Sequence, residues 1–199
     1  MAKVVQLQVD KFYFHYPAGA TIVTSHAHGR DNAMSVAWHT AMSHEPPYYL
    51  VSISPKRFTH QLIVESGEFT VNFMPSEKAQ LVALVAGCSG RDIDKFRRFQ
   101  IEAGQGTRVK SPVLAAAFAA YECRVVGRHT YGDHDLFVGE VLAVQWEETA
   151  FLNDGTLDME GNCPVVYMGG DWYASATQKS YLDRRALVDA ALGATSKAL

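Results

Sequence analysis

The chain has 199 residues, of which 48% are hydrophobic and 20% are charged, so it can bury the core of one domain and is not expected to be disordered. A formal net charge of −3 supplies no general field for nucleic acid or an anionic membrane, so any anion site has to be local. Three cysteines without CxxC spacing, and no apolar run long enough to span a bilayer, favour a cytoplasmic protein with reduced thiols.

The first half of the chain predicts strands interrupted by short helices. Strands are expected at 19–27, 33–38, 48–55 and 68–74, because β-branched or alternating apolar residues fill these segments. Helices are expected at 57–67, 76–87 and 92–99. We expect the first three strands to be neighbours in one sheet. Gly67 is the expected stop of the first helix, and Asp92 the expected cap of the third.

The second half predicts two long strands, at 118–132 and 134–148, joined by a turn at Gly132 and Asp133. Consecutive strands with little helix between them favour an antiparallel barrel or sandwich over a parallel doubly wound sheet. No GxGxxG follows a strand, so no dinucleotide-binding fingerprint is present. We expect one domain at 1–175, followed at 176–199 by a helical tail that packs on the barrel or on a partner subunit.

The segment SISPKRFTH, at 52–60, combines hydroxyl groups and cations just where a strand gives way to a helix. A helix start offers unpaired backbone N–H groups and the positive end of the helix dipole. The planar guanidinium group of Arg57 can donate to two phosphate oxygens at once, and Ser54 and Thr59 offer hydroxyl groups. The segment therefore predicts an anion site. The alternative is that a hydroxyl caps the helix while Lys56 and Arg57 are solvated.

The strand before this segment carries small or polar side chains where a filled barrel wall would have bulky ones. These are Asn32, Ala33, Ser35 and Ala37. Such a strand leaves room for a flat ligand against exposed backbone, and an aromatic heterocycle would fit that slot.

Several segments together resemble the flavin reductase-like family, which has an FMN-binding split-barrel fold and includes flavoredoxins and the reductase components of monooxygenases. The segments are NAMSVAW at 32–38, EPP at 45–47, SISPKRFTH at 52–60, FTVN at 69–72, GCSGRDIDKF at 87–96, and GDH with GEV at 132–141. The resemblance covers the chain from the start of the barrel to Tyr173, and its specificity comes from the order and spacing of the segments.

The resemblance implies a mainly β, α+β fold: an antiparallel, Greek-key split β-barrel that binds FMN. It implies an NAD(P)H-dependent flavin or ferric reductase, and a homodimer with flavin sites near the interface. The implied flavin-ring neighbours are Asn32, Ser35, Val36, Ala37 and Trp38. The implied ribityl and phosphate neighbours are Ser52, Ser54, Arg57 and Thr59, with Asn72 and Phe73 beside the ribityl chain and Lys95 reaching the flavin from its other side or from the partner subunit.

The hydride donor and the electron acceptor are less well specified. In this family the flavin carries out the redox chemistry, so no acid–base pair is required. His134, in the turn between the two long strands, is the candidate for the nicotinamide side, although a solvent-exposed turn histidine is as good an interpretation. The acceptor could be free flavin, a ferric chelate or a monooxygenase partner.

Other functions also fit parts of the sequence. The barrel could carry electrons on FMN without using NAD(P)H itself. His26 and His28, followed by Asp31, resemble the first metal motif of cupin barrels, but a second motif is missing and an exposed turn around Gly29 fits better, so no metal is expected. The basic run DKFRRF at 94–99 is short and lies among acidic residues, so neither nucleic acid nor membrane is an expected partner.

Overall fold

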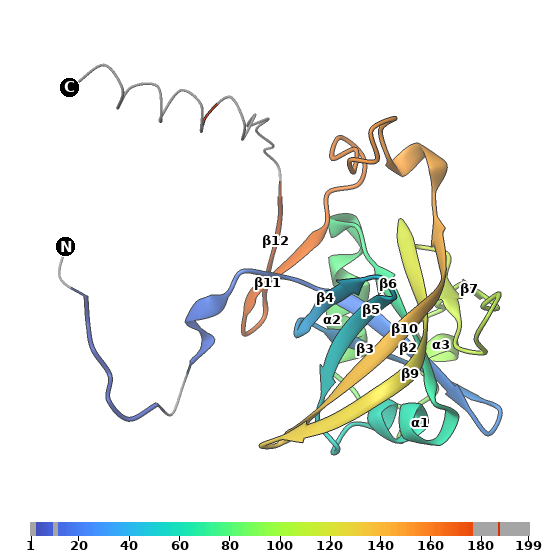
Figure 1. The fold of residues 1–199 in the computed structure, drawn as a ribbon, viewed down its shortest axis with the longest axis horizontal. Helices are drawn as coiled ribbons and strands as arrows, with labels where there is room; N and C mark the ends of the chain where they lie inside the picture. Colours follow the sequence, from blue (N-terminus) through green and yellow to red (C-terminus); the bar gives the residue numbers. More distant parts are fainter. Residues whose placement is uncertain (1–2, 10–11, 177–186, 188–199) are drawn as a thin grey trace.

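A computed structural model describes residues 3–9, 12–176 and 187, and its centre is a seven-stranded antiparallel sheet (Figure 1). The strand order is β3-β2-β6-β9-β10-β5-β4. The strands are β2 (Thr21–Ala27), β3 (Arg30–Val36), β4 (His39–His44), β5 (Pro47–Ile53), β6 (Glu68–Phe73), β9 (Ala119–Tyr131) and β10 (His134–Trp146). The predicted antiparallel architecture is confirmed, as is the turn at Gly132, whose φ is +60°. The predicted tail lies almost wholly outside the described residues.

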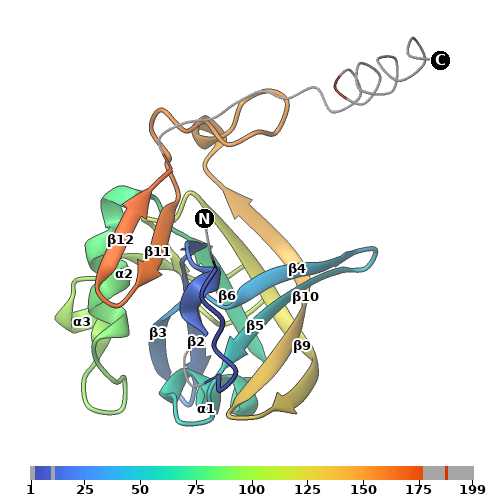
Figure 2. The same cartoon turned by 90° about the vertical axis from the view of Figure 1, so that its left-hand side faces the viewer.

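Only two residues join β3, at one edge of the sheet, to β4, at the other edge, so the sheet curls until its edges meet. At this junction the β4–β5 ladder extends by one pair, and the backbone N–H of Ser52 donates to the carbonyl of Trp38 at 2.9 Å. This closure gives the split barrel. A smaller three-stranded sheet, in the order β1-β11-β12, lies in front of the second helix in Figure 2. Its strands are β1 (Ala18–Gly19), β11 (Val165–Gly169) and β12 (Trp172–Ser175), while β7 (Ala103–Gly104) pairs with β8 (Val113–Leu114).

One expected neighbour relationship is wrong. β2 and β3 pair as predicted, but β5 lies near the opposite edge of the sheet, between β10 and β4. The cause is β4, which was not predicted because most of its side chains are exposed and it shows no apolar alternation. β4 carries the chain away from β3 and forms a hairpin with β5 instead.

The helices are α1 (Phe58–Ser66), α2 (Ala79–Ala86) and α3 (Lys95–Arg98), with 3₁₀ turns η1 (Tyr13–His15), η2 (Ser76–Lys78) and η3 (Glu148–Ala150). α1 ends at Gly67 as predicted, with a φ of +73° and its N–H bound to the carbonyl of Ile63. The predicted cap of the third helix was wrong. Residues 89–93 form a turn, so the helix begins later and Asp94 accepts the N–H of Arg97 at 3.0 Å. In the described part of the chain, no helix has the length and apolar character that a membrane crossing requires.

The two larger of three apolar clusters in the described residues lie on opposite sides of the sheet, because successive residues of a strand face opposite sides. Val23 faces the barrel interior with Phe69 and Phe137, whereas Ile22 packs on the other side against α2. Gly139 is required at its position in β10, since a Cβ there would lie 2.7 Å from the ring of Phe69. The barrel core is therefore closely packed around this ring.

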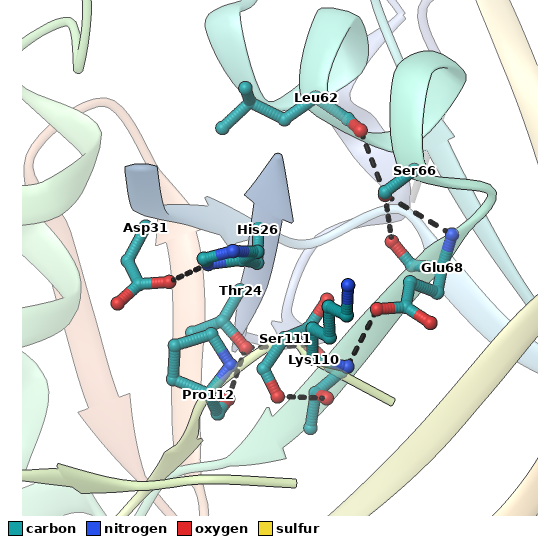
Figure 3. Close-up of polar contacts among 10 residues, drawn as sticks. Thr24, His26, Asp31, Leu62, Ser66, Glu68, Lys110, Ser111 and Pro112 are labelled. Carbon is teal, nitrogen blue, oxygen red and sulfur yellow. Dashed lines mark hydrogen bonds and ion pairs between the residues drawn. The ribbon is translucent and has the colours of Figure 1, made fainter. Parts of the chain in front are cut away.

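Side chains of the sheet fasten the loop at 105–112 to the outside of the barrel. Glu68 accepts the N–H of Lys110 at 2.6 Å, and Thr24 donates to the carbonyl of Pro112 at 2.5 Å (Figure 3). Glu122, which has no exposed surface, accepts the N–H groups of Arg108 at 2.6 Å and Val109 at 3.1 Å. Burial opposes ionisation of Glu122, but these hydrogen bonds outweigh it and hold the pKa of the carboxyl group below its usual value.

We expect Glu122→Gln to lower the free energy of unfolding by roughly 1–3 kcal/mol at neutral pH, because the amide carries no charge and its NH2 group has to face a donor, either the loop N–H groups or the Gln145 amide. A depressed folded-state pKa gives stability that is present above the unfolded-state pKa and lost as pH falls through the folded-state pKa. The difference between parent and variant should therefore shrink in acid. Urea unfolding at neutral and acidic pH measures it, and a pH-independent difference would contradict this role.

Candidate functional site

A cavity of about 460 Å³ lies at the start of α1. Its lining residues are Asn32, Met34, Ser35, Lys56, Arg57, Phe58, Thr59, Val85, Ala86, Gly87, Cys88, Ser89, Gly90, Arg91 and Lys95. Four of these residues are cations and none is a carboxylate, although the whole chain has a net charge of −3. Local positive charge in a negatively charged protein indicates an anion site. We call this the cationic cavity.

The start of α1 leaves its first N–H groups without a side-chain cap. Arg57 occupies the N-cap position, and no side-chain hydrogen bond caps the helix. Neither Ser54 nor Thr59 is therefore a capping residue. Thr59 accepts a hydrogen bond from the amide nitrogen of Asn32 at 2.7 Å, so its hydroxyl proton is free to donate to an anion. Both the hydroxyl and the helix start thus remain available to a ligand.

The loop after α2 forms the opposite wall of the cationic cavity and is fixed to the start of α1. Arg30 donates to the carbonyl of Gly90 at 2.6 Å, and Arg91 donates to the carbonyl of Lys56 at 2.9 Å. The two guanidinium groups lie 4.8 and 5.6 Å from the centre of the Phe58 ring. Gly90 has to be glycine, because a Cβ would lie 2.9 Å from the Phe58 ring and 2.0 Å from the side-chain oxygen of Asn32.

Lys95 contributes a fixed charge to the same cavity. Its side chain is buried, and Nζ donates to the carbonyls of Ala33 at 2.8 Å and Val85 at 2.6 Å, which joins β3 to α2. Burial lowers the pKa of Lys95; nearby Cys88 opposes this effect and the charge of Arg57 adds to it. An anion in the cavity would favour the charged form of Lys95.

A second cavity, of about 430 Å³, adjoins the first. Its lining residues are Tyr16, Ala20, Ser35, Ala37, Trp38, Ser52, Arg57, Val82, Ala83, Ala86, Gly87, His134, Tyr167, Gly170, Asp171 and Tyr173. We call this the aromatic cavity. Ser35, Arg57, Ala86 and Gly87 line both cavities, so the two lie side by side. Together they suit an elongated ligand with an anionic end and a flat end.

Aromatic contacts give the second cavity its shape. The Trp38 and His134 rings lie 5.0 Å apart, and the Trp38 indole N–H donates to the Tyr16 hydroxyl at 3.1 Å. Tyr167 contacts Tyr16 at 5.0 Å between ring centres. His134 also bonds to the carboxylate of Asp133 at 2.8 Å, which fixes one ring nitrogen.

The structure brings together most of the residues expected at the site. Asn32, Ser35, Ala37, Trp38, Ser52, Arg57, Thr59, Lys95 and His134 line one or both cavities. Val36 and Ser54 are buried beside the site and line neither cavity.

Asn72 and Phe73 also lie outside both cavities. The Asn72 side chain binds the carbonyl of Ile22 and the N–H of Leu114, and Phe73 packs against Tyr121 with 4.8 Å between ring centres. Both side chains are thus used in the interior of the fold, and we leave them out of the proposed site.

The structure adds residues that sequence reasoning did not single out. Ser89 and Arg91 line the cationic cavity, and Tyr167 and Tyr173 line the aromatic cavity. The first two lie in the GCSGRDIDKF segment, so only their individual roles were missed. The two tyrosines could have been noticed because they lie on either side of the Gly169–Gly170 pair, which is a turn signal, and the strands joined by this turn bring them together.

The arrangement of His26 and His28 does not support a metal barrel. His26 bonds to Asp31 at 2.6 Å (Figure 3), whereas His28 lies in the predicted turn with a φ of +51° and contacts Glu65 at 3.4 Å. The two imidazoles thus have separate partners. Among the described residues, no group of three or more His, Cys, Asp or Glu side chains could hold a metal ion.

Comparison with known proteins agrees with this geometry. The family model described as "Flavin reductase like domain" matches residues 13–174. An uncharacterized protein of Aeropyrum pernix is 30% identical over 171 residues, which are 85% of this chain and 64% of that protein, so the chain spans less than two thirds of this relative. The reductase component of the FADH(2)-dependent resorcinol hydroxylase of Rhizobium sp. is 34% identical over 138 residues, 67% of this chain and 74% of that protein.

A solved structure extends the comparison to nearly the whole chain. The FMN-binding protein of Thermus thermophilus, crystallised with 1-cyclohex-2-enone, superposes with a TM-score of 0.81 at 34% identity and covers 92% of this chain and 99% of its own. The family model alone covers well over half of the chain. This protein therefore belongs to the flavin reductase like domain family.

Proposed function

We propose that this protein binds FMN and transfers electrons from NAD(P)H through it to an acceptor. The observation that carries the proposal is that the cationic and aromatic cavities adjoin at Arg57, which lines both. FMN has a phosphate at one end and a flat three-ring system at the other, and each cavity has the size usual for a small-molecule site. The donors present fit a monophosphate, since cations and hydroxyls are available and no carboxylate opposes them.

In the proposed complex, Arg57, Arg91 and Thr59 hold the phosphate. The small side chains of Ser35 and Ala37, together with Trp38 and Ser52, bound the space for the ring system. Bound FMN would supply the hydride and electron chemistry, and the protein orients it and controls access to it. His134 lies on the aromatic side and is our candidate for contacting the nicotinamide.

The acceptor is a separate part of the proposal. The Rhizobium relative is a reductase component, which favours a flavin or monooxygenase acceptor, and the Thermus neighbour was crystallised with a cyclic enone. A planar ketone would suit the aromatic cavity of this chain, because rings from three parts of the fold surround it. A ferric chelate is a further candidate, and the competing proposal is an FMN-dependent carrier that NAD(P)H does not reduce.

We also propose a cytoplasmic homodimer. Large apolar side chains on the N-terminal segment are almost fully exposed: Val4 by 98%, Leu7 by 92% and Phe14 by 89%. Figure 1 shows this segment leading away from the barrel. Trp172, next to the Gly170–Asp171 edge of the aromatic cavity, is 77% exposed. Exposed apolar surface of this extent favours a homodimer in which the second subunit covers these side chains, and the position of Trp172 puts that interface close to the site.

Anaerobic mixing with NADH or NADPH tests the main proposal. The purified protein should be yellow, release FMN on heating, and bleach with at least one of the two nucleotides. Adding ferric citrate or cyclohex-2-enone to the bleached protein should restore its colour if that compound is of the true acceptor class, whereas a flavin acceptor is shown when added free flavin itself bleaches in the presence of excess nucleotide. A yellow protein that neither nucleotide bleaches would identify a carrier, and a colourless protein that does not bind added FMN would contradict the proposal.

Arg57→Ala should weaken FMN binding about ten- to a hundredfold, because it removes a charge-assisted contact worth roughly 1.5–3 kcal/mol. Riboflavin, which lacks the phosphate, should bind variant and parent almost equally. Fluorescence titration of the apoprotein with both flavins measures the difference. Arg124→Ala is the matched control, since Arg124 pairs with Glu140 on the surface, away from both cavities. Equal losses for both flavins, or no loss, would remove Arg57 from the phosphate site.

Light scattering of the holoprotein at micromolar concentration should give twice the chain mass of 21.9 kDa. Phe14→Ser combined with Trp172→Ser should shift the population toward monomer, because both substitutions reduce the exposed apolar surface. A parent protein that is monomeric while FMN is bound would contradict the dimer.

A further inference from the structure

A buried histidine–aspartate pair lies inside the barrel, outside both cavities. Nε2 of His60 donates to the Asp135 carboxylate at 2.7 Å, and the two side chains are 11% and 6% exposed. The other carboxylate oxygen of Asp135 accepts the Thr130 hydroxyl at 2.7 Å, and Nε of Arg128 lies 3.7 Å from the oxygen that binds His60. The His60 ring packs edge-on against Phe137, 5.1 Å between centres. The pair therefore has defined geometry on both sides.

The pair joins the two halves of the proposed site. Along α1, His60 directly follows Thr59, which lines the cationic cavity. Along β10, Asp135 directly follows His134, which lines the aromatic cavity. Successive strand residues face opposite sides, so Asp135 points into the barrel while His134 faces the ligand space. In Figures 1 and 2, α1 and the tip of the β9–β10 hairpin lie at the same end of the molecule.

The tip of this hairpin has few other attachments. Asp135 pairs with Ile53 at the end of the ladder between β10 and β5, so His134 lies just beyond that ladder. β9 pairs with β6 only as far as Arg124, and from there to Tyr131 its ladder partner is β10 alone. β10 itself pairs with β5 from Asp135 to Glu140, so only the turn from Tyr131 to His134 extends beyond three paired strands. The His60–Asp135 hydrogen bond attaches the base of this turn to α1.

Stability alone does not explain such a pair. Replacing a buried ion pair by well-packed apolar side chains is often neutral or stabilising. A hydrogen-bonded pair adds direction, since it fixes which atoms of two elements meet. Hydrogen bonding from His60, followed by that from Thr130, holds the pKa of Asp135 below its usual value, so the acceptor stays ionised at neutral pH.

We propose that His60 and Asp135 are positioning residues, which hold His134 at a fixed place relative to the helix that binds the FMN phosphate. The pair thereby fixes the distance and direction between the phosphate-binding end of the site and the side from which the hydride donor approaches. This inference rests on the proposed function, because it gives His134 the nicotinamide side of the site. Neither positioning residue touches the ligand space itself.

The variants Asp135→Asn and His60→Leu break the contact, whereas His60→Gln keeps a side-chain N–H donor. In the holoprotein, the first two should raise the KM for the pyridine nucleotide about tenfold, with FMN affinity and kcat changed by less than about threefold. His60→Gln should lie near the parent. Thr130→Val, which removes only the second hydrogen bond of Asp135, should give a smaller rise in KM and serves if a stronger variant does not fold.

Two further measurements separate positioning from a general loss of stability. In the His134→Ala background, Asp135→Asn should not raise KM further, because there is no imidazole left to position. The NMR signals of the His134 ring, assigned by their loss in His134→Ala, should shift in Asp135→Asn as the ring moves relative to Trp38. Glu122→Gln is the control: it should lower the unfolding temperature and leave both KM and the His134 signals unchanged.

A lower unfolding temperature in Asp135→Asn with unchanged KM and unchanged His134 signals would overturn the inference. An equal rise in KM with and without His134, or the same His134 shifts in Glu122→Gln, would also overturn it. If the parent does not oxidise NADH or NADPH, the proposed function fails. The His134 signals then still show whether the pair fixes the hairpin tip.

Discussion

Closure of the barrel, imposed by the two-residue connection between the edge strands β3 and β4, is the constraint on which the site depends. β3 and β5 are five strand spacings apart in the sheet order, which in a flat sheet would separate them by roughly 24 Å. Curling removes this separation. Trp38, just after β3, then faces the same space as Arg57, just after β5, and one continuous cavity forms between an aromatic wall and a helix start.

The charges around that cavity oppose each other in the absence of an anion. Lys56, Arg57, Arg91 and Lys95 line one small space without a carboxylate, and like charges at this range repel. The protein limits the cost by fixing the cations to backbone carbonyls: Lys95 to β3 and α2, and Arg91 to the start of α1. Because these long side chains are already held in place, they lose less conformational entropy when a phosphate binds. Anion binding and local stability are therefore linked in the same residues.

Local signals explain which parts of the fold could be predicted from the sequence. Gly67, with its positive φ, marks the end of α1, and hydrophobic alternation located the long strands β9 and β10. β4 carries no such signal and was missed, which also misplaced β5 in the sheet. At the site, the segment at 52–60 was predictable because its hydroxyls and cations are adjacent in sequence. The burial of Lys95 was not, because its acceptors belong to β3 and α2, and sequence spacing does not reveal which distant carbonyls will converge.

Buried polar groups serve two different purposes in this barrel. Glu122 accepts the N–H groups of a loop on the outer side of the sheet, so its hydrogen bonds attach that loop to the sheet. His60 and Asp135 instead connect a helix to a strand through polar side chains, and the residues beside them face the two cavities. Apolar packing around Phe137 can keep α1 and β10 in contact, but it does not by itself fix their relative position along the contact. A ligand held at one end by α1 and flanked at the other by β10 requires that relative position to be fixed, and a directional hydrogen bond between the two elements supplies the constraint.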